Sequence, residues 1–475
     1  MLLPITLPST TRRGLLRAHE ALLGRNTFEI LNRLDHAVDF DSASWLKQLA
    51  AFLGHATSEI PYWQARLGVI SQEAFRLDEL QTFPILTRDE IVRHRDEMRW
   101  QGPGKCLIHK SGGTTDDNLI FYWGREREAW DRATRARGLS RLGVLPGDSI
   151  LHLWPRERAS KTRESLKDLA RDTRDWLIAD PVVDPRPWTH KRLQRIIEHI
   201  NRFRPKAIIA YPSWLMRVAA FVKSEDCSLT HQPHLLLTCG EVLFAYQREY
   251  IEKIFKTNVY QEYGSQDAGL IAHEDTNQKL HPNPEPMLVE LLRNGKAASP
   301  GELGELVVTH FYTQRMPFIR YATGDVARMP SSSKFSFTDP DAVFPTIEGR
   351  TSDLLIDDTG NLKCGRPIIQ AIMEKTGIHL FNLQQGESGK IEVSSARKTG
   401  IIPKMEVAGV LHDHLGSAMQ LDFIEGDDFE SLRSGKHRFV CNPQAGRLLS
   451  HDTRSGTELS RSFPQRLEHG SITLA

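Results

Sequence analysis

The N-terminal part of the chain carries apolar residues at helical spacing. From Leu15 to about Arg66 they recur every three or four positions, as at Ile30 and Leu34, and this period predicts helices that pack on the body of the protein. Further along, Thr87 and Glu90 stand three residues apart at the start of another helical pattern. This spacing predicts a helix with Thr87 as its N-cap and a capping box completed by Glu90.

The middle of the chain alternates short apolar runs with helical patterns. Short apolar runs between turn signals are typical of buried strands, and strand-helix alternation favours a largely parallel sheet. We therefore predict a fold of the α/β class. The predicted strands cover Ser149–Leu153, Ala207–Ala210, His234–Thr238 and Asn258–Tyr260, and the predicted helices cover Lys191–Phe203, Ser213–Val222 and Tyr246–Phe255.

The pattern changes twice in the second half of the chain. Apolar runs at Met287–Leu292 and Gly304–Thr309 are joined through turn residues, which predicts a smaller antiparallel β region. A second change falls near Gly349–Asp353, and from about Asn442 the chain is polar and aperiodic. A chain of 475 residues is too long for one core, which stops growing near roughly 250–300 residues. We predict a large N-terminal α/β domain over 1–349 that holds both sheets, a small α+β domain over 350–442 and a disordered tail over 443–475.

Composition excludes several classes of function. Hydrophobic residues make up 40% and charged residues 25% of the chain, as in water-soluble globular proteins, and no run of about 18 apolar residues could span a bilayer. The apolar start, Met1–Pro8, is short and is followed rather than preceded by arginines, so we predict a cytoplasmic protein. A net charge of +1 gives no global field for nucleic acid. The basic stretch Arg156–Arg174 is interleaved with acidic residues, which predicts a solvated helix or, alternatively, a contact with an anionic substrate or an acyl carrier.

The first candidate for chemistry is the segment Lys110–Asn118, which lies between two apolar runs and contains Ser-Gly-Gly-Thr-Thr. Glycines let a backbone turn tightly and approach a ligand, while hydroxyl and N–H groups can bind phosphate oxygens. The segment lacks the spacing and the lysine of a Walker A loop. On its own it also fits a simple hairpin loop, so its significance depends on the motifs that follow it.

Five further short motifs follow in order along the chain. With the first segment they resemble the adenylate-forming superfamily of acyl-CoA synthetases and adenylation domains, and within it the phenylacetate-CoA ligase and capsule-biosynthesis CapK-like branch. The resemblance runs from about Leu46 to Val440 and implies a large domain that binds ATP and the acid, and a small mobile C-terminal domain. The motifs are Thr238–Glu241, Tyr263–Asp267, Arg320–Asp325, Gly349–Arg350 and Ser434–Val440.

The resemblance implies a nucleotide site assembled from these motifs. Asp325 would accept hydrogen bonds from the ribose hydroxyls, and the flat ring of Tyr263 would stack near the adenine. The adenine would also lie along Gly240 and Glu241. From the residues alone, Tyr263 also fits a core tyrosine, and Asp325 fits a turn residue. The implied nucleotide-binding set is completed by Ser111, Gly112, Gly113, Thr114 and Thr115, which would order the β- and γ-phosphates, and by Gly264 and Ser265.

Catalysis in this family is nucleotidyl transfer, in which a substrate carboxylate attacks the α-phosphorus of ATP and pyrophosphate departs with magnesium. The protein supplies mainly position and compensating positive charge. The resemblance makes Lys436 the catalytic lysine of the mobile domain and places Arg350 at the domain junction near the nucleotide. An exposed lysine without function is the plain alternative for Lys436, and Lys390 is its competitor. The acid pocket is implied around Tyr211, Pro212 and Ser213.

The sequence departs from the family pattern at several positions. Asp267 stands where the family usually has a magnesium-binding glutamate, and its carboxylate reaches roughly 1.5 Å less far. A misplacement of about 1 Å can cost on the order of a hundredfold in rate. Asp116 and Asp117 replace the common glycine and proline. Of a Cys/His zinc quartet only His273 and His281 remain, so we expect no structural zinc. The five cysteines form no C-x-x-C pair and are predicted to be free and mostly buried.

The leading hypothesis is therefore an AMP-forming acid-thiol ligase with ATP and Mg²⁺ as cofactors. A small carboxylic acid would form an acyl-adenylate, and a thiol of CoA or of an acyl-carrier protein would then capture the acyl group. One alternative is a stand-alone adenylase that hands its acyl-adenylate to another acceptor. Another is a degenerate nucleotide-binding scaffold without turnover. No nucleic-acid partner and no membrane span are expected.

Overall fold

The computed structural model describes residues 7–36, 40–111, 119–156, 172–175, 177–225, 227–331, 335–386, 389–396, 402–426, 436–442 and 444–445. Of the predicted phosphate loop, Gly112, Gly113, Thr114 and Thr115 lie outside these residues, together with Asp116 and Asp117. Most of the basic stretch and the predicted tail beyond Ala445 lie outside them as well. None of the helices in the described ranges combines the length and the apolar character that a membrane span requires.

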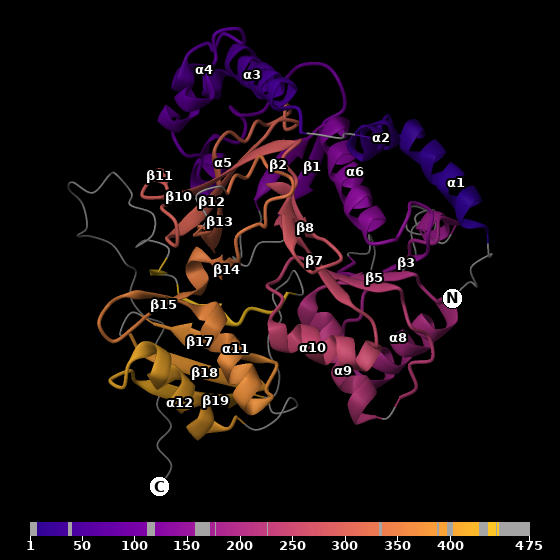
Figure 1. Ribbon diagram of the computed structural model, residues 1–475, viewed down its shortest axis with the longest axis vertical. Helices are drawn as coiled ribbons and strands as arrows, with labels where there is room; N and C mark the ends of the chain where they lie inside the picture. Colours follow the sequence, from indigo (N-terminus) through magenta and orange to yellow (C-terminus); the bar gives the residue numbers. More distant parts are fainter. Residues whose placement is uncertain are drawn as a thin grey trace.

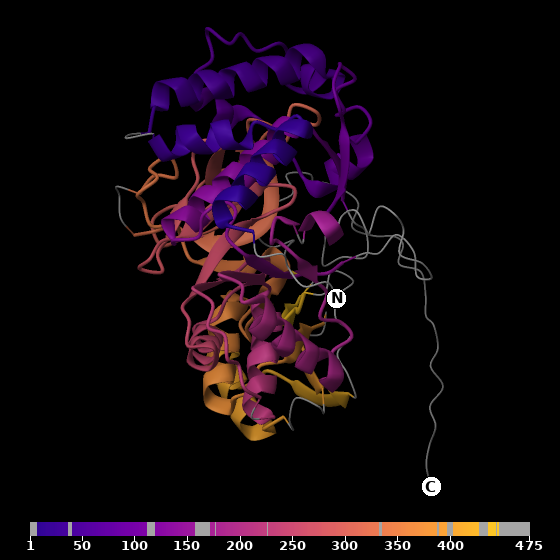
Figure 2. The same cartoon turned by 90° about the vertical axis from the view of Figure 1, so that its right-hand side faces the viewer.

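Helices form the N-terminal part of the molecule, as the apolar period predicts (Figure 1). The capping box at the start of the last helix is present, because the Thr87 hydroxyl accepts from Glu90 N at 3.3 Å and Glu90 Oε2 accepts from Thr87 N at 3.0 Å. In the view of Figure 2 these helices gather at one end of the molecule. They are α1 (Ser9–Leu22), α2 (Thr27–His36), α3 (Ser42–Glu59), α4 (Pro61–Leu67), a 3-10 turn (Leu77–Thr82) and α5 (Arg88–His94).

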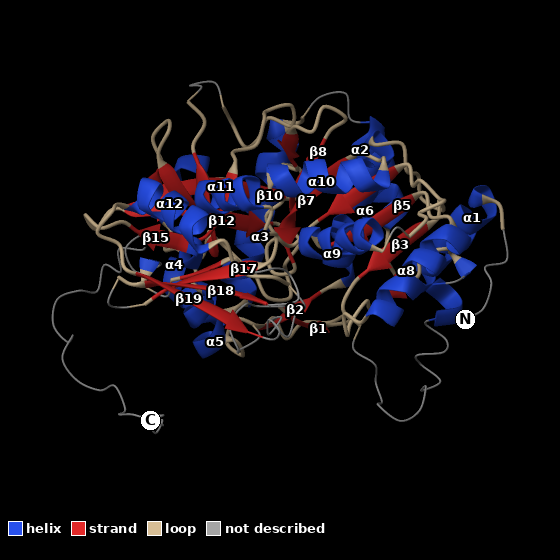
Figure 3. Cartoon of the chain, turned by 90° about the horizontal axis from the view of Figure 1, so that it is seen from below, coloured by secondary structure: helices blue, strands red, loops and turns tan. Residues whose placement is uncertain are grey.

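A seven-stranded sheet with the order β4-β3-β5-β6-β7-β8-β9 forms the centre of the fold. The first five strands pair in parallel and the last two add on in antiparallel fashion. Every residue of β5 and β6 is buried, as expected for parallel strands covered on both faces by helices (Figure 3). The predicted parallel α/β architecture is confirmed. The strands are β3 (Ile150–Leu153), β4 (Val182–Val183), β5 (Ala207–Ala210), β6 (Leu235–Thr238), β7 (Val259–Ser265), β8 (Gly269–Glu274) and β9 (Leu280–Pro282), with helices α6 (Arg125–Arg141), α8 (His190–Phe203), α9 (Pro212–Ser224) and α10 (Ala245–Phe255).

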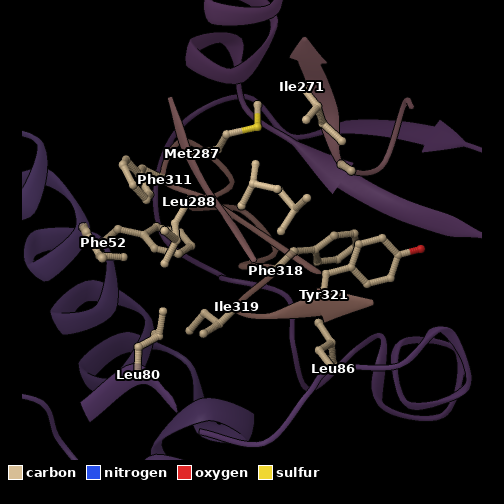
Figure 4. Close-up of a cluster of buried hydrophobic side chains, with 14 of the residues drawn as sticks. Phe52, Leu80, Leu86, Ile271, Met287, Leu288, Phe311, Phe318, Ile319 and Tyr321 are labelled. Carbon is tan, nitrogen blue, oxygen red and sulfur yellow. The ribbon is translucent and has the colours of Figure 1, made fainter. Parts of the chain in front are cut away.

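The predicted antiparallel region is a five-stranded sheet with the order β11-β10-β12-β13-β14. Its inner face shares the largest core with the N-terminal helices, and Figure 4 shows Phe52 of α3 beside Leu288 and Phe311. Tyr321 packs in this core by its ring while its hydroxyl points out of the cluster (Figure 4). The strands are β10 (Met287–Arg293), β11 (Lys296–Ala297), β12 (Leu303–His310), β13 (Tyr321–Arg328) and β14 (Ile347–Arg350), and a separate hairpin joins β1 (Leu107–Lys110) and β2 (Ile120–Trp123).

The C-terminal elements form a compact α+β unit, which lies at one end of the molecule in Figures 1 and 2. The predicted boundary between residues 349 and 350 falls inside β14, one residue before this strand ends at Arg350, and β15 begins at Leu354. The division into domains stays a prediction. Ala445, within the predicted tail, is fully buried beside Val326 and Leu354. The elements are β15 (Leu354–Ile356), β16 (Leu362–Cys364), α11 (Gly365–Thr376), β17 (Phe381–Gln385), β18 (Ile391–Ala396), α12 (Lys404–Leu415), β19 (Leu421–Gly426) and β20 (Val440–Cys441), in a sheet of order β19-β18-β17-β20 with β15 and β16 apart.

Candidate active site

Three predicted site residues meet from three strands that belong to two sheets. Asp325 of β13 and Arg350 of β14 are register partners, and the Arg350 Nε atom lies 3.4 Å from Asp325 Oδ1. The hydroxyl of Tyr263, from β7, donates to Asp325 Oδ2 at 2.7 Å. Burial raises the pKa of Asp325 and the Arg350 charge opposes this shift, while the Asp325 carboxylate raises the pKa of Arg350. The carboxylate is thus held in place with a fixed positive partner.

Asp267 lies in the turn between β7 and β8, close to this group. Its Oδ2 atom accepts from the Tyr321 hydroxyl at 2.7 Å, and its Oδ1 atom accepts from the Ser265 hydroxyl. Ser265 Oγ in turn accepts from Ala268 N at 3.1 Å, so the turn orients the carboxylate. The described part of the chain contains no cluster of three or more His, Cys, Asp or Glu side chains that could hold a metal by themselves. A single oriented carboxylate fits Mg²⁺, which proteins usually bind through one or two carboxylates together with substrate phosphates.

Lys436 lies in the same site although it comes from the C-terminal unit. Its Nζ atom is 5.7 Å from the centroid of the Tyr211 ring, and the pKa of Lys436 is lowered, chiefly by burial and then by the Arg350 charge. A Cβ atom on Gly240 would lie 3.3 Å from Lys436 Cε and 2.9 Å from Tyr211 Cε1. Gly240 also has φ of +76°, a conformation that favours glycine. The absence of a side chain there lets the lysine and the tyrosine approach each other. Lys390, the competitor, instead forms an ion pair with Asp422.

The carboxylate of Glu241 connects the beginning of α9 to the segment that carries Lys436. It accepts from Ser213 N at 3.0 Å and from Ser213 Oγ at 2.9 Å, at the beginning of α9, where Pro212 is the first residue. It also accepts from His437 N at 2.7 Å. Burial raises the pKa of Glu241, and these three donors oppose the shift. The adenine-binding role predicted for Glu241 stays a prediction. Its side chain forms hydrogen bonds with Ser213 and with His437.

A second set of contacts holds the C-terminal segment at the junction. Arg350 N donates to Asp353 Oδ2 at 2.9 Å, and the Arg438 guanidinium lies 3.4 Å from Asp353 Oδ1. Arg438 also donates to Ser352 Oγ at 2.6 Å, and His437 Nε2 lies 2.9 Å from the carbonyl oxygen of Phe381. Contacts with Ser352, Asp353 and Phe381 thus fix the two residues that follow Lys436.

Two residues of the site, Tyr321 and Glu305, were not predicted, and neither was the hydrogen bond that Ser111 makes. Tyr321 lies inside the motif Arg320–Asp325, but its hydrogen bond to Asp267 joins β13 to the turn between β7 and β8, and the two residues are 54 positions apart. Glu305 accepts from Gly324 N at 3.2 Å, and burial raises its pKa to about 7. Ser111, the described residue of the predicted phosphate loop, accepts from Leu119 N at 3.1 Å and so closes the base of the β1–β2 hairpin. None of these contacts leaves a local signal in the sequence.

His273 and His281, the two histidines compared with a zinc quartet above, both have protein partners. His273 Nδ1 lies 2.8 Å from Asn283 Oδ1, and His281 Nε2 lies 3.3 Å from Asp275 Oδ2. The five cysteines are free, as predicted. The prediction that they are mostly buried was wrong, because only Cys239 is buried and the other four are partly exposed.

No protein-family model matches the chain. Its fold is nevertheless that of the adenylate-forming ligases. The structure of 2-hydroxyisobutyryl-CoA ligase with R3-HIB-AMP, in the postadenylation state, superposes with a TM-score of 0.63 at 14% identity over 86% of this chain and 90% of that one. The anthranilate CoA ligase AuaEII in complex with anthranoyl-AMP superposes with a TM-score of 0.52 at 13% identity over 87% and 95%.

Similarity in sequence points to one branch of these proteins. CapK of Staphylococcus aureus is 22% identical over 383 residues, which span 78% of this chain and 82% of CapK. Phenylacetate-coenzyme A ligase of Pseudomonas putida is 23% identical over 332 residues, 66% of this chain and 71% of the ligase. The predicted resemblance to the adenylate-forming superfamily, and within it to the phenylacetate-CoA ligase and CapK-like branch, is confirmed.

Proposed function

We propose that the chain is an AMP-forming ligase that activates a carboxylic acid with ATP and then transfers the acyl group to CoA. The observation that carries the proposal is the meeting of Lys436 with Asp325 and Arg350 beside Gly240. A buried lysine beside an arginine and beside a carboxylate that can bind the ribose hydroxyls is suited to nucleotidyl transfer. The names of the relatives and the ligands of the structural neighbours support the same chemistry.

In this proposal the residues act mainly by position and charge. Asp325 accepts from the two ribose hydroxyls, and the ring of Tyr263, held by its bond to Asp325, lies near the base. Lys436 and Arg350 place positive charge where negative charge develops as the acid attacks the α-phosphorus. Asp267 would hold Mg²⁺, which compensates the charge of the departing pyrophosphate when it is bound.

The remaining assignments complete the same site. The phosphates bind at the loop of Ser111, Gly112, Gly113, Thr114 and Thr115, with Gly264 and Ser265 beside them. The acid enters next to Tyr211, Pro212 and Ser213, where the buried Tyr211 ring contacts Trp154 and Trp214. Residues 1–349 would bind ATP and the acid, and residues 350–442 would deliver Lys436 and withdraw it for thioester formation.

The test is pyrophosphate release and hydroxamate trapping with a panel of aryl, fatty and dicarboxylic acids. Release that depends on one class of acid supports the proposal, and thioester formation after CoA is added identifies the acceptor. If the adenylate forms and CoA does not capture the acyl group, the protein is a stand-alone adenylase or serves a carrier protein. If ATP binds and no acid releases pyrophosphate, the proposal fails and the protein is a nucleotide-binding scaffold.

A further inference from the structure

The strand that carries Asp325, β13, leaves its register with the neighbouring strand β12 just before this residue (Figure 1). Regular pairing stops after Ala322 and resumes at Val326, so the three residues 323–325 of β13 lie opposite the single residue Leu306 of β12. Bulges of this kind bend a strand and re-aim its side chains, and they are frequent next to active sites. Asp325 is the last residue of the bulge, so the bulge sets the position from which its carboxylate enters the site.

Two side chains replace the regular backbone hydrogen bonds inside the bulge. Gly324 N donates to Glu305 Oε1 at 3.2 Å. The Thr323 hydroxyl donates to the carbonyl oxygen of Leu306 at 2.9 Å and accepts from Asp325 N at 3.1 Å. Gly324 has φ of +75°, a conformation that favours glycine. The backbone N–H groups of Gly324 and Asp325 thus both have side-chain acceptors, which gives the bulge one defined shape.

Glu305 makes its contact to the bulge in an unfavourable place for a carboxylate. Burial raises the pKa of Glu305 to about 7, the Gly324 N–H group opposes this shift, and the negative charge of Asp325 adds to it. Two carboxylates close together repel each other, so an apolar residue at position 305 would remove this repulsion. Groups held in such an environment beside a site are candidates for a functional role.

We propose that Glu305 is a positioning residue for nucleotide recognition, which holds Gly324 N and so fixes the bulge from which Asp325 binds the ribose hydroxyls. Tyr263 and Arg350 hold the side chain of Asp325, whereas Glu305 holds the backbone that precedes it. Both are needed, because a hydrogen bond to a ribose hydroxyl weakens steeply once its donor and acceptor are misplaced. This inference rests on the proposed function, which assigns the ribose of ATP to Asp325.

The experiment measures the dissociation constants of ATP and of 2′,3′-dideoxy-ATP by calorimetry on the full chain. The second nucleotide lacks both ribose hydroxyls, so the ratio of the two constants reports the contact with Asp325. Hydrogen bonds to a charged group correspond to a preference of roughly tenfold to a hundredfold for ATP. We expect Glu305→Ala to lower this ratio by about tenfold, because it weakens the binding of ATP and leaves that of the dideoxy nucleotide unchanged. Glu305→Gln keeps an acceptor for Gly324 N and should retain most of the ratio.

Glu302→Ala is the matched control, because Glu302 Oε2 also accepts from a backbone N–H group, that of Ser299 at 2.9 Å, in the turn before β12. It lies outside the bulge and should leave the ratio unchanged. If Glu305→Ala does not fold, Glu305→Leu makes the same comparison, since leucine fills the space without offering an acceptor.

The inference is overturned if the variants without an acceptor at position 305 keep the wild-type ratio. It is also overturned if they weaken the binding of both nucleotides equally, which marks a purely structural glutamate. Asp325→Ala separates these results from a failure of the proposed function. Loss of the ratio in Asp325→Ala, together with a wild-type ratio in Glu305→Ala, overturns the inference alone. Equal binding of both nucleotides by the wild type contradicts the proposed ribose site and the inference with it.

Discussion

Replacing Glu241 by glutamine tests whether its carboxylate positions Lys436. The carboxylate accepts three hydrogen bonds, two from Ser213 and one from His437 N. A glutamine side chain has only one oxygen, so its amide nitrogen must replace one of the two carboxylate oxygens. The nitrogen then faces Ser213 N in one orientation, or His437 N together with Ser213 Oγ in the other, and these groups donate to the carboxylate in the wild type. At least one charge-assisted hydrogen bond is therefore lost, which corresponds to about 1.5–3 kcal/mol.

The loss falls on the contact that joins the Lys436 segment to Glu241 and the beginning of α9. A change of that size shifts the equilibrium of the contact by roughly tenfold to a hundredfold. We expect Glu241→Gln to lower the rate of pyrophosphate release by about this factor. Thioester formation from a supplied acyl-adenylate and CoA should stay close to the wild-type rate, because in the proposal Lys436 withdraws during that step. Glu249→Gln, an exposed position on α10, is the matched control and should change neither step.

Two results would refute this reasoning. Equal loss of both half-reactions would mean that Glu241 maintains the fold and does not position Lys436 for the first step. An unchanged rate of pyrophosphate release would mean that the contact to His437 does not hold the reactive arrangement. Thermal unfolding of both variants separates the first outcome from a general loss of stability.

Three further predictions follow from the site. Asp267→Asn removes the carboxylate oriented by Tyr321 and should raise the Mg²⁺ concentration for half-maximal activity by about tenfold or more; an unchanged metal titration would contradict the assignment. Gly240→Ala places a Cβ atom against Tyr211 and Lys436 at a residue with positive φ. The substitution should lower the free energy of unfolding by about 1–2 kcal/mol and should also lower the rate of pyrophosphate release. A fully active variant of normal stability would refute the packing argument. Because burial lowers the pKa of Lys436, its charge is present at low pH and lost on raising the pH through a value below that of an ordinary lysine. Activity should therefore fall on the alkaline side, and Lys436→Arg should move that limb to higher pH; an identical limb in both would exclude Lys436 as its origin.

Much of the fold could be predicted because its signals are local. The β5 strand matches the predicted run Ala207–Ala210, and β6 begins one residue after the predicted start at His234. The Thr87 capping box needs only the residues within one turn. These elements are set by apolar period and by side-chain capping, which act over a few residues.

The contacts within the site depend on the tertiary structure and could not be predicted from local pattern. Asp325 and Arg350 meet through the register of an antiparallel pair that contains an irregularity. Glu241 and His437 are 196 residues apart, and their contact depends on how the C-terminal unit docks. The burial of Ala445 depends likewise on Val326 and Leu354 and not on the polar residues around it. The sequence motifs identify the candidate site residues, whereas the tertiary structure determines which residues each of them contacts.

The most direct test of the central claim is the Lys436→Ala variant, assayed for ATP binding and for pyrophosphate release with the best acid of the panel. Lys436 is brought into the site from the C-terminal unit, next to Gly240 and Tyr211. Loss of compensating charge at the reacting phosphate should lower pyrophosphate release by at least about a hundredfold while ATP binding stays within a fewfold of wild type. Near-normal pyrophosphate release in Lys436→Ala would contradict the account.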